Sequence, residues 1–210
     1  MSNRKSKTTI GPVEFIHRVI KHDEKGEPFA LAAYQRRVLE MALRRDPSGE
    51  LVFRLVVLSE PKKSGKTFTT ACLALWWAVT NPHTEIIIIA NDLVQSVSRV
   101  FKTMTALIEQ NEALGQEADV LSSSIRVDNG TLILPIASDY KGAASSRHSL
   151  VCTTRFGASR ARRRALHGCT ETSGCRRSRA LSILDYGTKT STRRYARKQP
   201  AHCLLELTLA

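Results

Sequence analysis

The sequence predicts an α/β fold with a mostly parallel sheet. Two segments carry this prediction: residues 51–58 are rich in branched apolar side chains, and residues 85–90 contain four consecutive isoleucines. Apolar runs of this length indicate strands buried on both faces, as in parallel sheets. A helical pattern follows each run, so the order strand, helix, strand, helix, strand predicts βαβ units with right-handed crossovers.

Helices are predicted before and between these strands. Apolar residues at three- and four-residue spacing predict helices over residues 13–21 and 31–45, and a long apolar segment predicts one over residues 66–79. Asn91 and Asp92 are expected to cap a further helix.

The remaining predicted strands lie in the second half of the chain. Asn129 and Gly130 predict a type I′ turn inside a hairpin over residues 125–134, because that turn favours the Asn-Gly dipeptide. Residues 149–152 begin another apolar strand. A length of 210 residues suits one domain, or one domain followed by a tail.

Charge divides the chain into two parts. The chain holds 32 Lys and Arg against 19 Asp and Glu, a net charge of +13. Residues 153–210 contain 13 of the basic and three of the acidic residues, so they carry +10, and residues 1–152 carry only +3. The net charge of +13 indicates an acidic partner such as nucleic acid, and its concentration in residues 153–210 weakens that inference.

Several features argue against a membrane or secreted protein. The longest apolar run, residues 71–79, is far shorter than the ~20 residues that span a bilayer. The polar N-terminus lacks the apolar core of a signal peptide. The five cysteines include no Cys-x-x-Cys pair, which argues against a zinc ribbon or a disulfide framework. These observations predict a protein of the cytoplasm.

A phosphate-binding loop (Walker A) is predicted between the first strand and the helix that follows it. The consensus is Gly-x-x-x-x-Gly-Lys-Ser/Thr, and the chain has Gly65, Lys66 and Thr67 at the right positions, with Glu60 in place of the first glycine. Gly65 lets backbone N–H groups approach a phosphate closely. Lys66 can reach the β- and γ-phosphates, and the Thr67 hydroxyl can bind Mg²⁺. The position between an apolar strand and an apolar helix favours this interpretation over a solvated basic turn.

Gln35 and Tyr34 are further candidates, on the helix before the loop. A glutamine amide can pair with the edge of adenine through two hydrogen bonds, and a tyrosine ring can stack on the base. By residue type alone, a glutamine on the surface of the helix is the commoner interpretation. Trp76 and Trp77 are expected in the core rather than at a cofactor.

Four segments resemble the large subunit of tailed-bacteriophage terminase, the motor that packages DNA. They are residues 29–35, 61–67, 87–95 and 140–148, and the likeness runs over residues 12–152. The resemblance implies a P-loop NTPase three-layer core with a mostly parallel sheet, incomplete at its C-terminal side, that uses ATP and Mg²⁺. In this family the first loop glycine is commonly absent, and a basic residue precedes Gly-Lys-Thr.

The resemblance also implies roles for single residues and for partners. Gln35 would contact adenine, and Lys62 or Lys63 would sense the γ-phosphate. The candidate catalytic residues are Lys66 and Lys62, and the candidate metal ligand is Thr67. The nucleotide-binding candidates are Gln35, Lys62, Lys63, Ser64, Gly65, Lys66 and Thr67. The implied partners are double-stranded DNA, the terminase small subunit, the portal protein and further copies of the intact protein, in the host-cell cytoplasm and without a membrane.

The resemblance stops after Cys152. The family continues with an Asp-Glu pair that holds Mg²⁺ and activates the attacking water, whereas this chain has no carboxylate before Glu171. A back-translation of Tyr-Asp-Glu-Ile-Trp-Gly-Val-Thr-Ser-Glu, read one base later, yields Thr-Thr-Arg-Phe-Gly-Ala-Ser-Arg-Ala, the sequence of residues 153–161. We therefore expect a frameshift after Cys152. It would make residues 153–210 an out-of-frame, poorly packed basic tail and leave ATP hydrolysis inefficient.

Three functions are open on this evidence. The first is a truncated terminase ATPase domain that binds ATP but lacks the acidic pair and the nuclease domain. The second is a nucleic-acid-binding protein that acts through residues 153–210 and would show salt-sensitive DNA affinity. The third is another small P-loop enzyme, such as a kinase, which would need a carboxylate near the loop.

Overall fold

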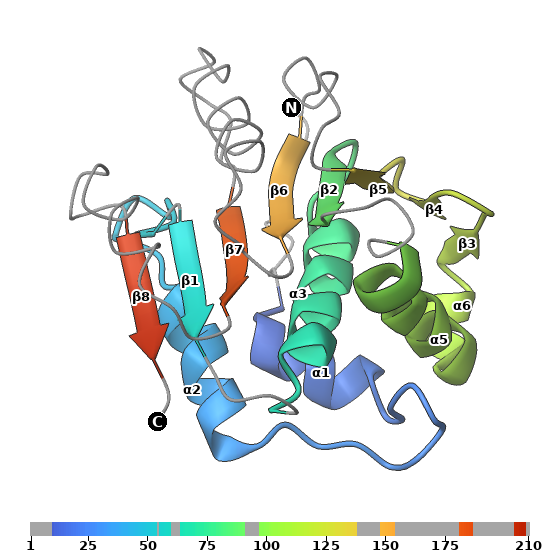
Figure 1. Cartoon of the computed structure of the whole chain (residues 1–210), viewed down its shortest axis with the longest axis horizontal. Helices are drawn as coiled ribbons and strands as arrows, with labels where there is room; N and C mark the ends of the chain where they lie inside the picture. Colours follow the sequence, from blue (N-terminus) through green and yellow to red (C-terminus); the bar gives the residue numbers. More distant parts are fainter. Residues whose placement is uncertain are drawn as a thin grey trace, which may run out of the picture.

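The computed structural model describes residues 10–53, 55–59, 64–90, 97–137, 148–153, 181–186 and 204–208. Within these ranges, one eight-stranded sheet lies against a layer of helices (Figure 1). The strand order across the sheet is β3-β4-β5-β2-β6-β7-β1-β8. The strands are β1 (Leu55–Ser59), β2 (Glu85–Ala90), β3 (Ala118–Val120), β4 (Ile125–Val127), β5 (Leu132–Ala137), β6 (His148–Thr153), β7 (Leu181–Tyr186) and β8 (Leu204–Thr208).

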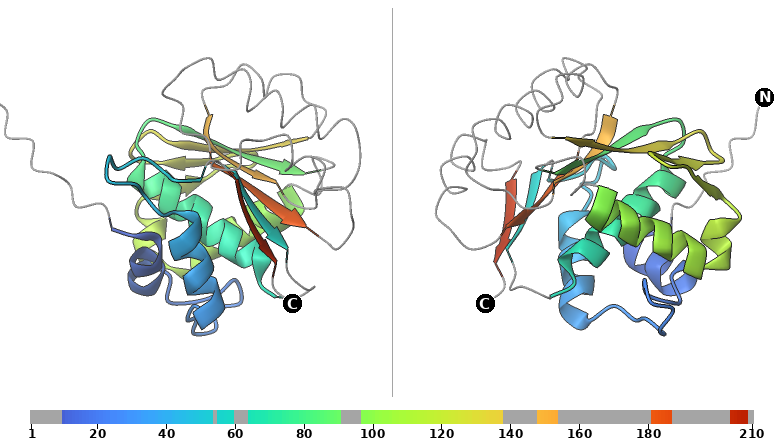
Figure 2. Two further views of the ribbon diagram at one scale, coloured as in Figure 1. Left: turned by 90° about the vertical axis from the view of Figure 1, so that its left-hand side faces the viewer. Right: turned by 45° about the vertical axis from the view of Figure 1, so that its right-hand side comes forward.

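The described helices gather on one face of the sheet (Figure 2). They are α1 (Pro12–Val19), α2 (Ala33–Ala42), α3 (Lys66–Thr80), the π-helix η1 (Val97–Phe101), α5 (Lys102–Gln110) and α6 (Glu112–Gly115). The central helix of this layer is α3, in which ten of 15 residues are buried. Among the described residues, helices cover one face of the sheet, so a second helical layer of the predicted three-layer core stays a prediction. The predicted cap at Asn91 and Asp92 lies outside the described residues.

The isoleucines of β2 are buried on both faces of the sheet. Ile86 and Ile88 belong to the main core, which includes α3, whereas Ile87 and Ile89 form a second apolar cluster with Val151 of β6. On its two sides β2 pairs in parallel with β5 and β6. The uninterrupted apolar run predicted this central, parallel position, and the structure confirms it.

The two tryptophans of α3 lie in the core, as predicted. The Nε1–H group of Trp77 donates to Ser149 Oγ at 3.0 Å, and that of Trp76 donates to the carbonyl oxygen of Ile10 at 2.8 Å. Burial therefore leaves neither indole N–H without an acceptor. The two bonds join α3 to β6 and to the segment that precedes α1.

The hairpin at residues 125–134 forms, but the predicted type I′ turn is wrong. The N–H of Gly130 donates to the carbonyl oxygen of Val127 at 2.8 Å, and Gly130, not Asn129, has the positive φ, +83°. This is a type I turn followed by a left-handed residue. Asn129 instead donates its Nδ2–H groups to two carbonyl oxygens near the C-terminal end of α3. This contact with α3 holds the loop in the observed geometry.

The strand β1 begins at Leu55, later than the predicted start at residue 51. Leu51 instead forms an isolated antiparallel bridge with Arg45. In the loop that this bridge closes, one carboxylate oxygen of Asp46 accepts hydrogen bonds from two N–H groups and one hydroxyl group. Leu51, the first residue of the predicted strand, therefore pairs with Arg45 at the end of this turn, and the strand of the sheet begins only at Leu55.

Two segments of the basic C-terminal part take part in the sheet. Between β6 and β1 lies β7, and β8 lies on the other side of β1, all in parallel. These two segments pair through the main chain along β1 and β6, and such pairing needs no long apolar period. The expectation that residues 153–210 are poorly packed stays a prediction. Residues 154–180, 187–203 and 209–210 lie outside the described residues. The division into a domain of residues 12–152 and a tail therefore stays a prediction.

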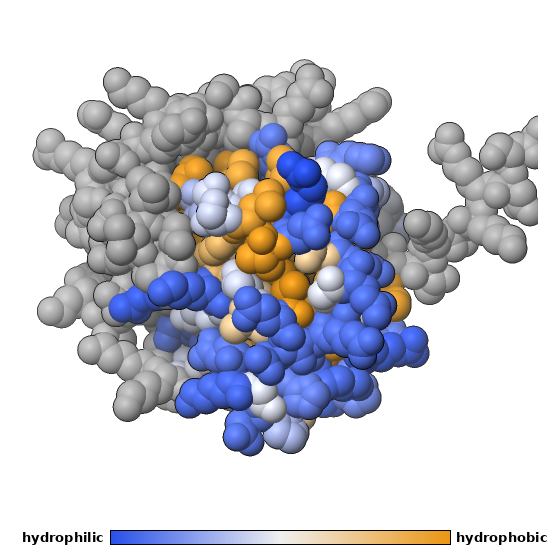
Figure 3. Space-filling model, turned by 90° about the vertical axis from the view of Figure 1, so that its right-hand side faces the viewer, coloured by the Kyte–Doolittle hydropathy of each residue, from blue (hydrophilic) through white to orange (hydrophobic). Residues whose placement is uncertain are grey.

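The surface of the described part is largely polar. Figure 3 shows one face on which hydrophilic residues border an apolar area below and on its right-hand side. The exposed large apolar side chains in the described ranges are Ile10, Tyr34, Val120 and Leu121. No described helix combines the length and the apolar character needed to cross a bilayer.

Candidate nucleotide-binding site

The loop between β1 and α3 lies at the carboxyl end of β1, as predicted: β1 ends at Ser59 and α3 begins at Lys66. Gly65 directly precedes the helix with φ +82° and ψ +13°, a left-handed conformation that favours glycine. Its carbonyl oxygen accepts the N–H of Thr69 at 2.9 Å, so Gly65 closes the first turn of α3. Such a helix N-terminus favours an anion through its N–H groups and its dipole.

Lys66 and Ser64 lie together at this end of α3. The ammonium group of Lys66 donates to Ser64 Oγ at 3.3 Å. Ser64, Lys66 and Thr67 are all half-buried. The residues predicted to bind phosphate and Mg²⁺ therefore occupy neighbouring positions at the first turn of α3. Lys62 and Lys63 lie outside the described residues, so the structure does not place them.

Gln35 is buried against the loop and is not a surface glutamine. It is 7% exposed, and its amide Nε2 donates to Thr69 Oγ1 at 3.1 Å. Its amide Oε1 accepts the N–H of Ala32 at 3.0 Å, which caps the start of α2. A Cβ atom added at Gly65 would lie 3.0 Å from Gln35 Nε2. The structure therefore brings Gln35 directly to the predicted phosphate-binding loop.

Two further contacts join this part of the chain to the loop and to the start of α3, and sequence reasoning missed both. The hydroxyl of Tyr34 donates to the carbonyl oxygen of Ser64, so it binds the loop backbone. The rings of Phe29 and Phe68 lie 4.3 Å apart between centroids, at an angle of 49°. Helical spacing could not have revealed these pairs, because they depend on how α2 and the segment before it meet α3.

The position of carboxylates matters for any metal-dependent chemistry here. No Asp or Glu occurs in β6, which ends at Thr153. The sheet register places Asp185 of β7 opposite Leu58 of β1, one residue before both strands end. This position lies at the same edge of the sheet as the loop. No group of three or more His, Cys, Asp or Glu residues that could hold a metal ion occurs within the described ranges.

The thiols of Cys72 on α3 and Cys152 on β6 are buried. Burial raises the pKa of both, that of Cys152 to about 12. Both thiols therefore stay protonated at neutral pH and act as core packing groups rather than as nucleophiles.

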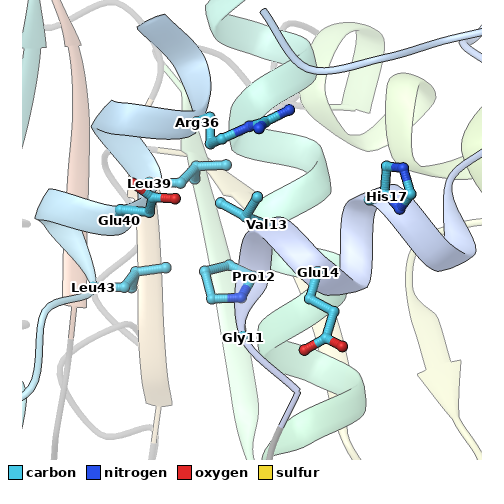
Figure 4. Close-up of a pocket in the computed structure, with 9 residues that line it drawn as sticks. All are labelled: Gly11, Pro12, Val13, Glu14, His17, Arg36, Leu39, Glu40 and Leu43. Carbon is cyan, nitrogen blue, oxygen red and sulfur yellow. The ribbon is translucent and has the colours of Figure 1, made fainter. Parts of the chain in front are cut away.

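A separate cavity of about 510 Å³ lies between α1 and α2 (Figure 4). Its lining residues are Gly11, Pro12, Val13, Glu14, His17, Arg36, Leu39, Glu40 and Leu43. None of them belongs to the predicted loop, and their charges are mixed in sign. We therefore place the candidate site at the loop and not in this cavity.

Solved structures of phage proteins share this fold, whereas no family model and no curated protein matches the chain. The large terminase of bacteriophage HK97 superimposes with a TM-score of 0.76 at 16% sequence identity, over 94% of this chain and 43% of that protein. The large terminase of a thermophilic bacteriophage, solved in complex with ADP, gives a TM-score of 0.63 at 11% identity, over 86% of this chain and 46% of that one.

The ATPase domain of the Thermus phage P74-26 large terminase gives a TM-score of 0.53 at 14% identity, over 77% of this chain and 67% of that domain. This chain thus spans less than half of the HK97 protein and of the terminase solved with ADP. At these identities the comparisons establish the fold. The chain has the fold of the ATPase part of phage large terminases.

Proposed function

We propose that this chain is the nucleotide-binding part of a phage terminase large subunit, a motor that packages viral DNA, and that it binds ATP with Mg²⁺ at the carboxyl end of β1. The observation that carries this proposal is the packing of the Gln35 amide against Gly65 at the start of α3. It joins a group suited to adenine and a loop suited to phosphate.

The residues of the loop suit a nucleoside triphosphate. Gly65 has no Cβ to obstruct its backbone, and Lys66 is held beside it by Ser64 Oγ. The Lys66 ammonium would bind the β- and γ-phosphates, and the Thr67 hydroxyl would be the protein's ligand for Mg²⁺. Bound Mg²⁺ would neutralise phosphate charge. Lys62 or Lys63 would contact the γ-phosphate.

Hydrolysis by the chain as it stands is proposed to be near background. The strand β6 is followed by no Asp-Glu pair, and a general base typically contributes ~10²–10⁴-fold to a rate. We attribute the missing pair to a frameshift after Cys152. The proposed partners are double-stranded DNA, the terminase small subunit, the portal protein and further copies of the motor.

Nucleotide binding is the first test. Fluorescent ATP should bind the full chain, and Lys66→Ala should raise its dissociation constant about 10- to 150-fold, since a charge-assisted hydrogen bond contributes about 1.5–3 kcal/mol. Lys102→Ala removes an exposed lysine of α5 and should change nothing. Binding that survives Lys66→Ala unchanged would contradict the phosphate site.

Turnover is the second test. Restoring the reading frame after Cys152 should produce ATP hydrolysis, which mutation of the restored Glu alone should remove while sparing binding. Rapid ATP hydrolysis by the chain without the restored reading frame, if Lys66→Ala abolishes it, would contradict the proposal. In that event Asp185→Asn would test whether the carboxylate of β7 replaces the missing pair.

A second candidate function rests on the charge of +10 in residues 153–210. A chain that acts through this segment would bind DNA with a steep salt dependence. Replacement of all 13 Lys and Arg of residues 153–210 by Gln would then remove DNA binding while ATP binding remained. DNA affinity that is unchanged by this replacement would exclude this alternative.

A further inference from the structure

The amide of Gln35 is held at both of its ends. Ala32 N–H donates to Oε1 at 3.0 Å, and Nε2 donates to Thr69 Oγ1 at 3.1 Å. A backbone N–H can only donate, so the contact with Ala32 determines which end of the amide carries the oxygen. Gln35 and Thr69 are 7% and 5% exposed, so water has little access to either end of this arrangement.

One hydrogen-bonding position is left at each end of the amide. A glutamine oxygen accepts two hydrogen bonds and its nitrogen donates two, and one of each is used here. The remaining acceptor and donor match adenine, whose N6–H donates and whose N7 accepts. Guanine presents two acceptors, O6 and N7, on the same edge. An amide held in this orientation would therefore place its oxygen opposite guanine O6, and two acceptors cannot form a hydrogen bond with each other.

Thr69 is held in place by the helix to which it belongs. Its N–H donates to the carbonyl oxygen of Gly65 at 2.9 Å, within the first turn of α3. That turn also contains Lys66 and Thr67, the proposed phosphate and Mg²⁺ residues. A hydroxyl placed on a helix is a firmer anchor than one on a loop. Its removal would leave a buried amide N–H without this acceptor, and the amide would be held at its oxygen alone, by the Ala32 N–H, so that its nitrogen end could shift.

We propose that Thr69 is a positioning residue for base selection: the Ala32 N–H sets which end of the Gln35 amide carries the oxygen, and the Thr69 hydroxyl holds the nitrogen end in the place that accepts adenine and not guanine. This inference rests on the proposed function, since it requires that Gln35 faces the base. It makes the preference for ATP over GTP depend on a side chain in the same first turn of α3 as the proposed phosphate residues.

The test is equilibrium binding of ribose-labelled fluorescent ATP and GTP to the full chain, because a ribose label leaves base and triphosphate unchanged. Thr69→Ser and Thr69→Ala differ from each other only by the hydroxyl. Thr69→Ser should keep the preference for ATP, whereas Thr69→Ala should reduce it about tenfold, by weakening ATP binding. The control is Thr70→Ala, which alters the next residue of α3, also buried, and should leave the ratio unchanged.

An equal loss of ATP and GTP affinity in Thr69→Ala, with the ratio unchanged, would overturn the inference, since it indicates packing alone. So would a parent chain that binds both nucleotides equally. A parent chain that binds neither nucleotide would overturn the proposed function itself.

Thermal unfolding is measured for each variant. If Thr69→Ala does not fold, Thr69→Val, which keeps the volume, replaces it in the comparison with Thr69→Ser.

Discussion

Gly65 and Gly49 have the same positive φ and offer a matched test of the contact with Gln35. Both have φ +82°. A Cβ atom on Gly49 would meet nothing within 4 Å, whereas one on Gly65 would lie 3.0 Å from Gln35 Nε2. We therefore expect Gly65→Ala to lower the free energy of unfolding by more than Gly49→Ala does.

The expected loss in the free energy of unfolding has two parts. The left-handed conformation costs an L-residue ~1–2 kcal/mol, and the reduced entropy of the unfolded alanine chain offsets ~0.4–1 kcal/mol of this. Gly49→Ala is thus expected to cost about 1 kcal/mol. Gly65→Ala also pushes Gln35 Nε2 aside by a few tenths of an ångström and weakens its hydrogen bond to Thr69 Oγ1, which contributes about 0.5–1.5 kcal/mol, so its total cost is about 1.5–2.5 kcal/mol.

The assay is urea denaturation, monitored through tryptophan fluorescence. The m-values of the variants are compared, because a shift in midpoint reports a change in stability when m is unchanged. Each glycine substitution is also made together with Gln35→Ala. In that background the two should cost the same, because the amide is gone. Equal costs in the parent background would refute the contact, and so would a difference that persists without the Gln35 side chain.

Three other predictions concern stability, pH and thiol chemistry. The amide of Asn111 is 3% exposed and makes four hydrogen bonds with backbone groups, so Asn111→Leu should lower the free energy of unfolding by about 2–4 kcal/mol. Gln116→Ala, at an exposed site, should stay within about 0.5 kcal/mol; similar losses for both would contradict the role of the buried amide. Hydrogen bonds, first that from the Ser48 hydroxyl and then that from the Glu50 N–H, lower the pKa of Asp46. Because the folded pKa lies below the unfolded one, this contribution is present above the unfolded pKa and is lost as pH falls through the folded pKa. The stability gap between the parent and Asp46→Asn should therefore shrink below about pH 4, and a gap independent of pH would contradict this. Burial raises the pKa of Cys152 to about 12, so peptide mapping after iodoacetamide treatment of the native chain at pH 8 should find it unmodified, and modification only after unfolding.

Local sequence determined the order and the type of most elements. The isoleucine run of residues 85–90 could lie only in the interior of a sheet, because burial on both faces is the way to remove so much apolar surface from water. The apolar segment of residues 66–79 predicted α3 almost to its ends. The loop between β1 and α3 followed from these two elements, since a Gly-Lys-Thr stretch in that position has a defined place in the fold.

Local sequence did not determine how the helices meet. Gln35 is buried because α2 brings it to Thr69, 34 residues away, and a polar residue type by itself predicts exposure. The turn after Val127 is type I because Asn129 reaches across to α3, which turn propensity does not describe.

Strand pairing in the C-terminal part depended on tertiary structure as well. The segment of residues 181–186 is too short for its period to distinguish a strand from a loop. It becomes β7 because β6 and β1 both offer main-chain partners to it, and only this pairing sets Asp185 beside Leu58. Patterns along the chain determined which segments must be buried, and contacts between distant segments decided which polar groups meet at the loop. Burial depends on the local period of apolar residues, whereas a hydrogen bond depends on the positions of two separate elements.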